Sequence, residues 1–269
     1  MEANLVRSHR SFSRVASTKM NSYYKLAYNY PASCSICCVL TKPPPSNHNH
    51  HSNYHVNYKD NWFDHLAINH LSQSIQATTG LRNKKSGYEG FVEAARMVYV
   101  NYNSKHDQVN LVIESLHRAF PKPILSLMKM LLPQSKWGRE YCAIFTTIFF
   151  AWLVGPCEVK ASEFNGRKEN NVVHIKKCRF LEETNCVGMC TNLCKMPSQL
   201  FIKDTLGMPV NMVPNFDDMS CEMIFGQDPP PPNTDPAFMQ PCYKLCKFNN
   251  KHQTDCNSQI KKKDHAEIS

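Results

Sequence analysis

Seven cysteines between residues 178 and 246 are the side chains of this sequence best suited to chemistry. They are Cys178, Cys186, Cys190, Cys194, Cys221, Cys242 and Cys246. Three residues separate Cys186 from Cys190, Cys190 from Cys194, and Cys242 from Cys246. Thiolates are ligands of zinc and iron, so this clustering predicts a metal site with four ligands drawn from the seven cysteines. Disulfides and buried free thiols are the alternatives that the pattern leaves open.

The spacing of the cysteines does not identify the metal. It differs from the Cys-x2-Cys pairs of zinc ribbons and from the cysteine run of bacterial ferredoxins. In one regular helix Cys186 and Cys194 would lie about 12 Å apart, too far to share one ion. Either a pair on one helix, such as Cys190 and Cys194, binds the metal with distant partners, or the backbone bends at Gly188. We expect the bend, so that Cys186, Cys190 and Cys194 bind a metal together with one further cysteine.

Residues 1–59 have the composition of an organellar transit peptide. They are rich in Ser and Asn, carry seven Lys and Arg against one acid, and contain no hydrophobic run long enough for a secretory signal. Residues 60–269 carry 24 Lys and Arg against 21 acids, and they show no basic stripe that would indicate nucleic-acid binding. A reducing organelle disfavours stable disulfides, which favours metal ligation by the later cysteines.

Helical periodicity dominates the sequence after residue 59. Apolar residues at helical spacing predict four helices, near 62–80, 88–102, 109–120 and 124–132. Pro121, Pro123 and Pro133 mark the ends of the last two helices, because proline cannot continue a helix. These helices are expected to share one core.

Residues 141–157 carry no charge. The run has 17 residues and ends in Gly-Pro-Cys, so it is too short for a transmembrane helix, which needs about 20 apolar residues. We expect it to be the central buried helix of the fold. The alternative is that its aromatic side chains line an apolar tunnel or contact a membrane surface.

The pattern changes to strands after Pro156. Asn165-Gly166 suits a type I′ turn and predicts a hairpin of residues 158–164 and 171–178. Further short strands are expected at 210–213 and 221–225, with a short helix at 198–206 that ends at Gly207. The predicted fold class is α+β, with a helical N-terminal half packed on a cysteine-rich half of short strands and helices. We expect residues 60–246 to form one domain, divided into 60–157 and 158–246, and residues 247–269 to form a disordered tail.

Four blocks of this sequence closely resemble the plant plastid β-carotene isomerases known as the Dwarf-twenty-seven family. They are Trp-Leu-Val-Gly-Pro-Cys-Glu-Val at 152–159, Cys-Arg-Phe-Leu-Glu at 178–182, Asn-Cys-Val-Gly-Met-Cys-Thr-Asn-Leu-Cys at 185–194 and Pro-Asn-Phe-Asp-Asp-Met-Ser-Cys-Glu-Met-Ile-Phe-Gly at 214–226. With residues 60–66 and 87–90, the resemblance extends over nearly the whole chain after residue 59. One departure is Ser198, where some relatives carry cysteine after the proline.

The resemblance implies an iron-dependent isomerase of the chloroplast. Such an enzyme converts all-trans-β-carotene to 9-cis-β-carotene, the first step towards strigolactones, and its product passes to carotenoid cleavage dioxygenases. Iron, either mononuclear or in an iron–sulfur cluster, can exchange one electron and so lower the order of a double bond temporarily. Zinc has no accessible redox change and cannot do this.

A hydrocarbon substrate requires an apolar pocket, and no individual catalytic residue is identifiable in the sequence. We predict that Phe145, Phe149, Phe150 and Trp152 form the wall of this pocket, and that the protein makes peripheral contact with a plastid membrane. Two other classes use the same cysteines without such a pocket. They are an iron–sulfur electron-transfer protein and a plastid interaction module stapled by zinc.

Overall fold

Helices build the N-terminal part of the structure, a computed structural model that describes residues 58–131 and 133–244. They are α1 (Trp62–Thr79), α2 (Gly87–Asn101), α3 (Lys105–Ala119), α4 (Lys122–Leu131), α5 (Lys136–Phe149) and the short α6 (Ala151–Val154). Asn61 and Asp64 form a capping box at the start of α1, and Gly80 ends that helix in the left-handed conformation. The first three predicted helices are confirmed, as is the fourth over its described residues.

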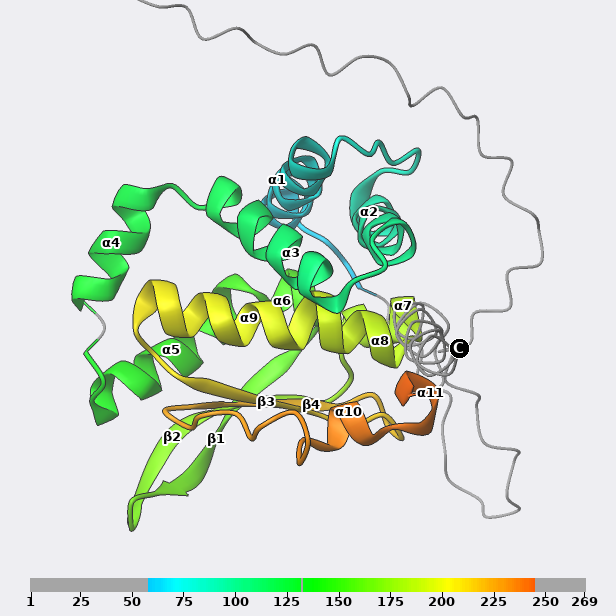
Figure 1. Cartoon of the computed structure of the whole chain (residues 1–269). Helices are drawn as coiled ribbons and strands as arrows, with labels where there is room; N and C mark the ends of the chain where they lie inside the picture. Colours follow the sequence, from blue (N-terminus) through cyan, green and yellow to red (C-terminus); the bar gives the residue numbers. More distant parts are fainter. Residues whose placement is uncertain (1–57, 132, 245–269) are drawn as a thin grey trace, which may run out of the picture. The chain divides into compact units, whose positions relative to one another are not determined.

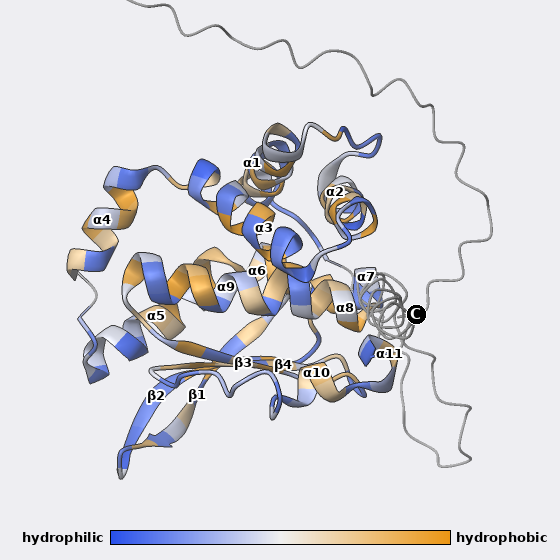
Figure 2. Cartoon of the chain, in the orientation of Figure 1, coloured by the Kyte–Doolittle hydropathy of each residue, from blue (hydrophilic) through white to orange (hydrophobic). Residues whose placement is uncertain are grey.

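Four antiparallel strands form the sheet of the C-terminal part, in the order β1-β2-β4-β3. Their bounds are β1 (Cys157–Phe164), β2 (Arg167–Ile175), β3 (Val210–Pro214) and β4 (Cys221–Phe225). Asn165 and Gly166 have φ values of 51° and 73°, so the predicted hairpin turn is confirmed. The tip of this hairpin is hydrophilic (Figure 2). Helices followed by an antiparallel sheet confirm the predicted α+β class.

A nearly continuous helical segment, residues 187–206, lies between α3 and the sheet (Figure 1). It consists of α8 (Val187–Met189), η1 (Cys190–Lys195), α9 (Met196–Phe201) and η2 (Ile202–Leu206), and it follows the short α7 (Arg179–Thr184). Residues 186–193 are all buried. Two more short helices, α10 (Pro236–Met239) and α11 (Pro241–Lys244), complete the described chain.

This central segment corrects two expectations. The central, mostly buried helical segment is 187–201 and not 141–157, which forms the C-terminal part of α5, then α6 and the start of β1, and leaves one stripe of α5 exposed. The backbone also does not bend at Gly188, because residues 189 and 190 keep right-handed helical φ and ψ values. Gly188 instead allows a close approach, since a Cβ at this position would overlap the hydroxyl of Tyr99.

The segments η1 and η2 are π-helical. Pro197 follows η1 and has no N–H to donate to the preceding turn, and the wider π turn accommodates this defect without ending the helix. The predicted short helix, which was expected to begin at Ser198 after the proline, therefore begins upstream of it. Asn192 of η1 donates to Gln108 at 2.7 Å and accepts from Tyr243 at 2.8 Å, which ties the central segment to α3 and α11.

Arg179 connects the first described residues to α7 and α2. Its guanidinium donates to both carboxylate oxygens of Asp60, and it lies over the rings of Tyr58 and Tyr88 at 4.6 and 3.7 Å. Tyr58 donates a hydrogen bond of 2.9 Å to Glu182. These contacts hold residues 58–60 against the folded part of the chain.

Candidate active site

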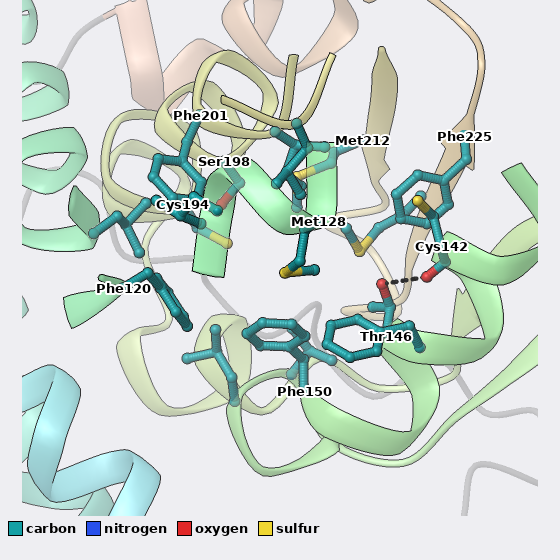
Figure 3. A pocket seen from close by; sticks show the side chains of 18 of the residues that line it. Phe120, Met128, Cys142, Thr146, Phe150, Cys194, Ser198, Phe201, Met212 and Phe225 are labelled. Atoms are coloured by element: carbon teal, nitrogen blue, oxygen red, sulfur yellow. Dashed lines mark hydrogen bonds between the residues drawn. The ribbon is translucent and has the colours of Figure 1, made fainter. Parts of the chain in front are cut away.

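An apolar pocket lies between α3, α4, α5, α6, the α9–η2 part of the central segment, and strands β3 and β4 (Figure 3). Its space, including the open mouth, is about 1050 Å³. The wall is formed by Leu116, Phe120, Leu125, Met128, Tyr141, Cys142, Phe145, Thr146, Phe150, Leu153, Val154, Cys194, Ser198, Phe201, Ile202, Leu206, Met212, Met223 and Phe225.

Regular structure aims these side chains into the pocket. On β4, Met223 and Phe225 lie two residues apart and so point to the same face of the sheet, and Met212 pairs with Met223 across the β3–β4 ladder. On α5, Cys142 and Thr146 are one helical turn apart and share a face. The pocket therefore has a rigid floor and one rigid helical wall.

Two hydroxyl groups in the wall, those of Thr146 and Ser198, are already bonded within the protein. Thr146 donates its hydroxyl hydrogen to the carbonyl of Cys142 at 2.8 Å, as the dashed line in Figure 3 marks. The side chains of Ser198 and Cys194 are hydrogen-bonded to each other. Burial raises the pKa of the Cys142 thiol to about 11 and that of Cys194 to about 12, so both are neutral at neutral pH. The described wall contains no charged side chain, and it suits an uncharged, apolar ligand.

Four buried thiols lie near one side of this pocket. Cys178, Cys190, Cys194 and Cys221 are close enough that an ionised thiol at one position affects the pKa of another. Burial is the first cause that raises their pKa values. Repulsion from other thiols of the cluster adds to it at Cys190, Cys194 and Cys221, while Lys195 partly offsets the shift at Cys190 and Cys221. We call these four residues the thiol cluster. Cys194 belongs both to the thiol cluster and to the pocket wall.

Cys186 lies apart from the thiol cluster. It occupies the N-cap position of α8, and its electrostatic neighbours include Cys242 and Tyr99. Cys190 and Cys194 instead face Cys178 and Cys221, which come from the start of α7 and from β4. The structure thus separates the three cysteines that the spacing had grouped. Cys246 lies outside the described residues.

Among the residues that the structure describes, no three His, Cys, Asp or Glu side chains converge closely enough to hold a metal ion. The thiol cluster, as it lies, therefore does not fit an iron site. Metal ligation by the predicted cysteines stays a prediction.

The predicted aromatic wall is divided by the structure. Phe145 and Phe150 line the pocket, whereas Phe149 and Trp152 do not. Phe149 is 43% exposed and stacks on Phe145 with a centroid distance of 4.4 Å. Trp152 is buried beside Phe150. Their role in substrate binding was inferred from the aromatic content of residues 141–157, which does not show the direction of each side chain.

Sequence reasoning missed the half of the wall formed by α3, α9, η2 and the strands. Phe120 and Phe201 face each other there with a centroid distance of 6.1 Å. The available signal was the apolar spacing of Phe201, Ile202 and Leu206 directly after the cysteine run. The sequence analysis assigned these residues only to a short helix.

Comparisons with known proteins agree with this arrangement. The profile of the family described as "Beta-carotene isomerase D27-like, C-terminal" matches residues 152–234. A protein of Medicago truncatula named "Beta-carotene isomerase D27, chloroplastic" is 67% identical over 201 residues, which cover 75% of this chain and 79% of that protein. The chain belongs to the β-carotene isomerase D27 family. An Arabidopsis thaliana member with the same name is 52% identical over 196 residues, covering 72% of this chain and 74% of that protein.

The region matched by the D27-like profile contains the whole thiol cluster and all four strands. It does not contain α1 to α5, which supply much of the pocket wall. No solved structure matches the chain.

Proposed function

We propose that this protein is the chloroplast isomerase that converts all-trans-β-carotene to 9-cis-β-carotene, with the polyene bound in the apolar pocket. Family membership supports carotene isomerisation, and the relatives are named chloroplastic. The observation that carries the proposal is an apolar pocket whose described wall has no charged side chain and whose Thr146 and Ser198 hydroxyls are already bonded within the protein. A hydrocarbon loses no hydrogen bonds with water on entering such a site, whereas a hydroxylated ligand would leave its hydroxyl unpaired at about 1–3 kcal/mol.

The wall residues can bind, orient and shield a polyene. Phe145 and Phe150 offer ring faces to a flat conjugated chain, and their rings meet edge to face at a centroid distance of 6.0 Å. The described wall contains no carboxyl or imidazole group, and its thiols have pKa values of about 11 and 12. These thiols are far too weak as acids to protonate a carbon–carbon double bond. We infer that the wall supplies shape and a dry environment.

The two alternative classes are less well supported. An electron-transfer protein and a zinc-stapled interaction module would both use buried cysteines, but neither requires a large apolar pocket beside them. Iron dependence, the strigolactone step, transfer of the product to carotenoid cleavage dioxygenases and contact with a plastid membrane remain proposals that rest on the family resemblance and on the nature of the substrate.

A pair of phenylalanines on α5 tests the pocket assignment. Phe145 lines the pocket and its neighbour Phe149 does not, so Phe145→Ala should lower kcat/KM and Phe149→Ala should leave it nearly unchanged. Losing the burial of one phenylalanine ring, about 1.5–3 kcal/mol, corresponds to a decrease of roughly ten- to hundredfold. The assay supplies all-trans-β-carotene to the full chain and follows the isomers by chromatography, with heat-killed protein as the control. No gain of the 9-cis isomer would reject the enzyme, and equal effects of the two variants would reject the site.

Iron is tested independently of activity. The full chain is purified anaerobically and its metal content is measured together with its visible absorption. If the thiol cluster holds iron, Cys190→Ser should lower the iron content, whereas Cys142→Ser, at a buried thiol outside the cluster, should not. Equal iron contents in the wild type and in both variants would reject the cluster as the ligand set.

A further inference from the structure

Helix α5 presents an apolar stripe to solvent. Trp137, Ile144 and Ile148 lie on one side of this helix, at positions i, i+7 and i+11, and Ile148 is 64% exposed. A helix that packs on a core normally turns its polar side outward. The opposite arrangement at this place indicates a surface that meets something apolar.

Helix α4 shows the same division between apolar side chains that line the pocket and apolar side chains that are exposed. Leu125 and Met128 point into the pocket wall, whereas Ile124, Leu127 and Met130 are exposed, Met130 by 75%. Figure 1 places α4 at the margin of the described chain, and its main contact is with η2. We define the apolar rim as Ile124, Leu127 and Met130 of α4 with Trp137, Ile144 and Ile148 of α5.

The apolar rim leads directly to the pocket. Trp137 stacks on Tyr141 with a centroid distance of 5.4 Å, and Tyr141 stacks on Phe145 at 6.1 Å. Tyr141 and Phe145 both line the pocket. One row of aromatic rings therefore runs from the exposed end of α5 to the pocket wall.

The stretch of chain that carries the apolar rim is basic. Between residues 115 and 139 the sequence contains Arg118, Lys122, Lys129, Lys136 and Arg139 and no acid. Three acids near this stretch are paired with its basic residues: Glu114 with Arg118, Glu140 with Lys136, and Glu169 with Arg139. Among the described residues, Lys122 and Lys129 have no ion-pair partner.

We propose that the apolar rim docks on the surface of an anionic lipid bilayer, with α4 and α5 lying at the level of the headgroups and the pocket facing the acyl chains. Apolar side chains with an aromatic residue and flanking lysines are the composition of helices that lie in a membrane interface. A symmetric contact with a second copy of the chain would place the same lysines against each other, which opposes it. In the described residues no helix is long and apolar enough to cross a bilayer.

The inference rests on the proposed function only for the direction in which the pocket faces. A lipid-soluble substrate could then pass from the acyl region to the pocket without crossing water. Docking itself depends on the exposed side chains and their charges, and it can be measured without substrate.

The experiment is vesicle flotation of the full chain without carotene. One set of vesicles is phosphatidylcholine, and the other is an equimolar mixture of phosphatidylcholine and phosphatidylglycerol. The wild type is expected to bind the anionic vesicles more tightly. Ile144→Ser/Ile148→Ser should weaken binding to both sets at least tenfold, as expected from removing two half-exposed isoleucines from an apolar contact.

Charge and location are separated by two further variants. Lys122→Glu/Lys129→Glu should lower binding to the anionic vesicles by roughly fivefold per lysine, with little change on the neutral vesicles. Val100→Ser/Met239→Ser removes two exposed apolar side chains outside the rim, and should bind like the wild type. Circular dichroism checks that every variant is folded.

Three results would overturn the proposal. In the first, the wild type binds neither set of vesicles. In the second, the rim variants bind as well as the control variant. In the third, sedimentation shows a dimer that the rim variants dissociate, while vesicle binding is absent. Isomerase activity is measured separately with carotene in detergent micelles, where docking is not needed. Loss of vesicle binding with full activity in micelles rejects the docking surface alone. Normal docking without activity in micelles rejects the proposed function alone.

Discussion

Replacing Lys195 with methionine tests the contribution of a buried charge pair beside the thiol cluster. The Nζ atom of Lys195 lies 2.5 Å from a carboxylate oxygen of Asp235, and the two side chains are 3% and 2% exposed. Methionine fills a similar volume but leaves the carboxylate of Asp235 buried without its cation. The remaining partner of that carboxylate is the backbone N–H of Ala237 at 3.0 Å. Breaking a buried pair in this way costs about 3–5 kcal/mol of the free energy of unfolding.

The chain contains a matched control for this substitution. Lys203 and Asp228 are also a Lys–Asp pair, with a distance of 2.7 Å, but both side chains are mostly exposed. Lys203→Met should therefore leave the free energy of unfolding almost unchanged, because water solvates the carboxylate that remains. The two variants make the same chemical change at nearly the same distance, and they differ mainly in burial.

Urea unfolding of the two variants supplies the measurement. With an m-value of about 2 kcal/mol/M, Lys195→Met should lower the midpoint by about 1.5–2.5 M. Adding Asp235→Asn should recover part of this loss, because the neutral amide removes the unpaired charge and its oxygen can still cap α10. Equal midpoints for Lys195→Met and Lys203→Met, or no recovery in the double variant, would refute the reasoning.

Two further predictions concern the surroundings of the pocket. Gly188→Ala should lower the free energy of unfolding by about 1–3 kcal/mol, because the new methyl group overlaps the hydroxyl of Tyr99. The same substitution should cost less in a Tyr99→Ala background. A double-mutant cycle measured by urea unfolding checks this coupling. The stability of the fold should decrease as the pH rises above about 9, because thiols of the unfolded chain ionise near that pH, whereas burial raises the pKa of Cys142 to about 11 and that of Cys194 to about 12 in the folded chain. Thermal unfolding from pH 7 to pH 10 measures this loss, and Cys142→Ala should reduce its slope; a melting temperature that rises over this range would contradict the assignment.

Local signals in the sequence were sufficient for most secondary structure. Proline positions bounded α3 and α4, and Asn165-Gly166 defined the hairpin, because these residues restrict the backbone regardless of their neighbours. The identity of the buried residues was harder to predict. Residues 141–157 lack charge because α5 serves a pocket on one side and exposes apolar residues on another, and hydropathy alone does not distinguish this from a buried helix.

The candidate site depends on features that spacing does not contain. Cys186, Cys190 and Cys194 look equivalent in the sequence, but Cys186 is the N-cap residue before α8 and has an extended backbone, whereas Cys190 and Cys194 lie within η1. Cys178 and Cys221 join Cys190 and Cys194 only through the tertiary packing of α7 and β4. Of the four aromatic residues predicted for the wall, Phe145 and Phe150 line the pocket and Phe149 and Trp152 do not. Aromatic content indicates a pocket, but the direction of each side chain around its helix decides which rings enter it.

The contacts of Arg179 set a limit on how the N-terminus can be shortened. A cut before Tyr58 would preserve the ring under the guanidinium, the carboxylate of Asp60 and the hydrogen bond to Glu182. A cut only three residues later would remove both Tyr58 and Asp60, and the guanidinium of Arg179, whose side chain is 7% exposed, would lose its counter-charge. Any maturation that removes the preceding segment is therefore constrained by the fold itself, since the contacts of Arg179 form only if residues 58–60 stay attached.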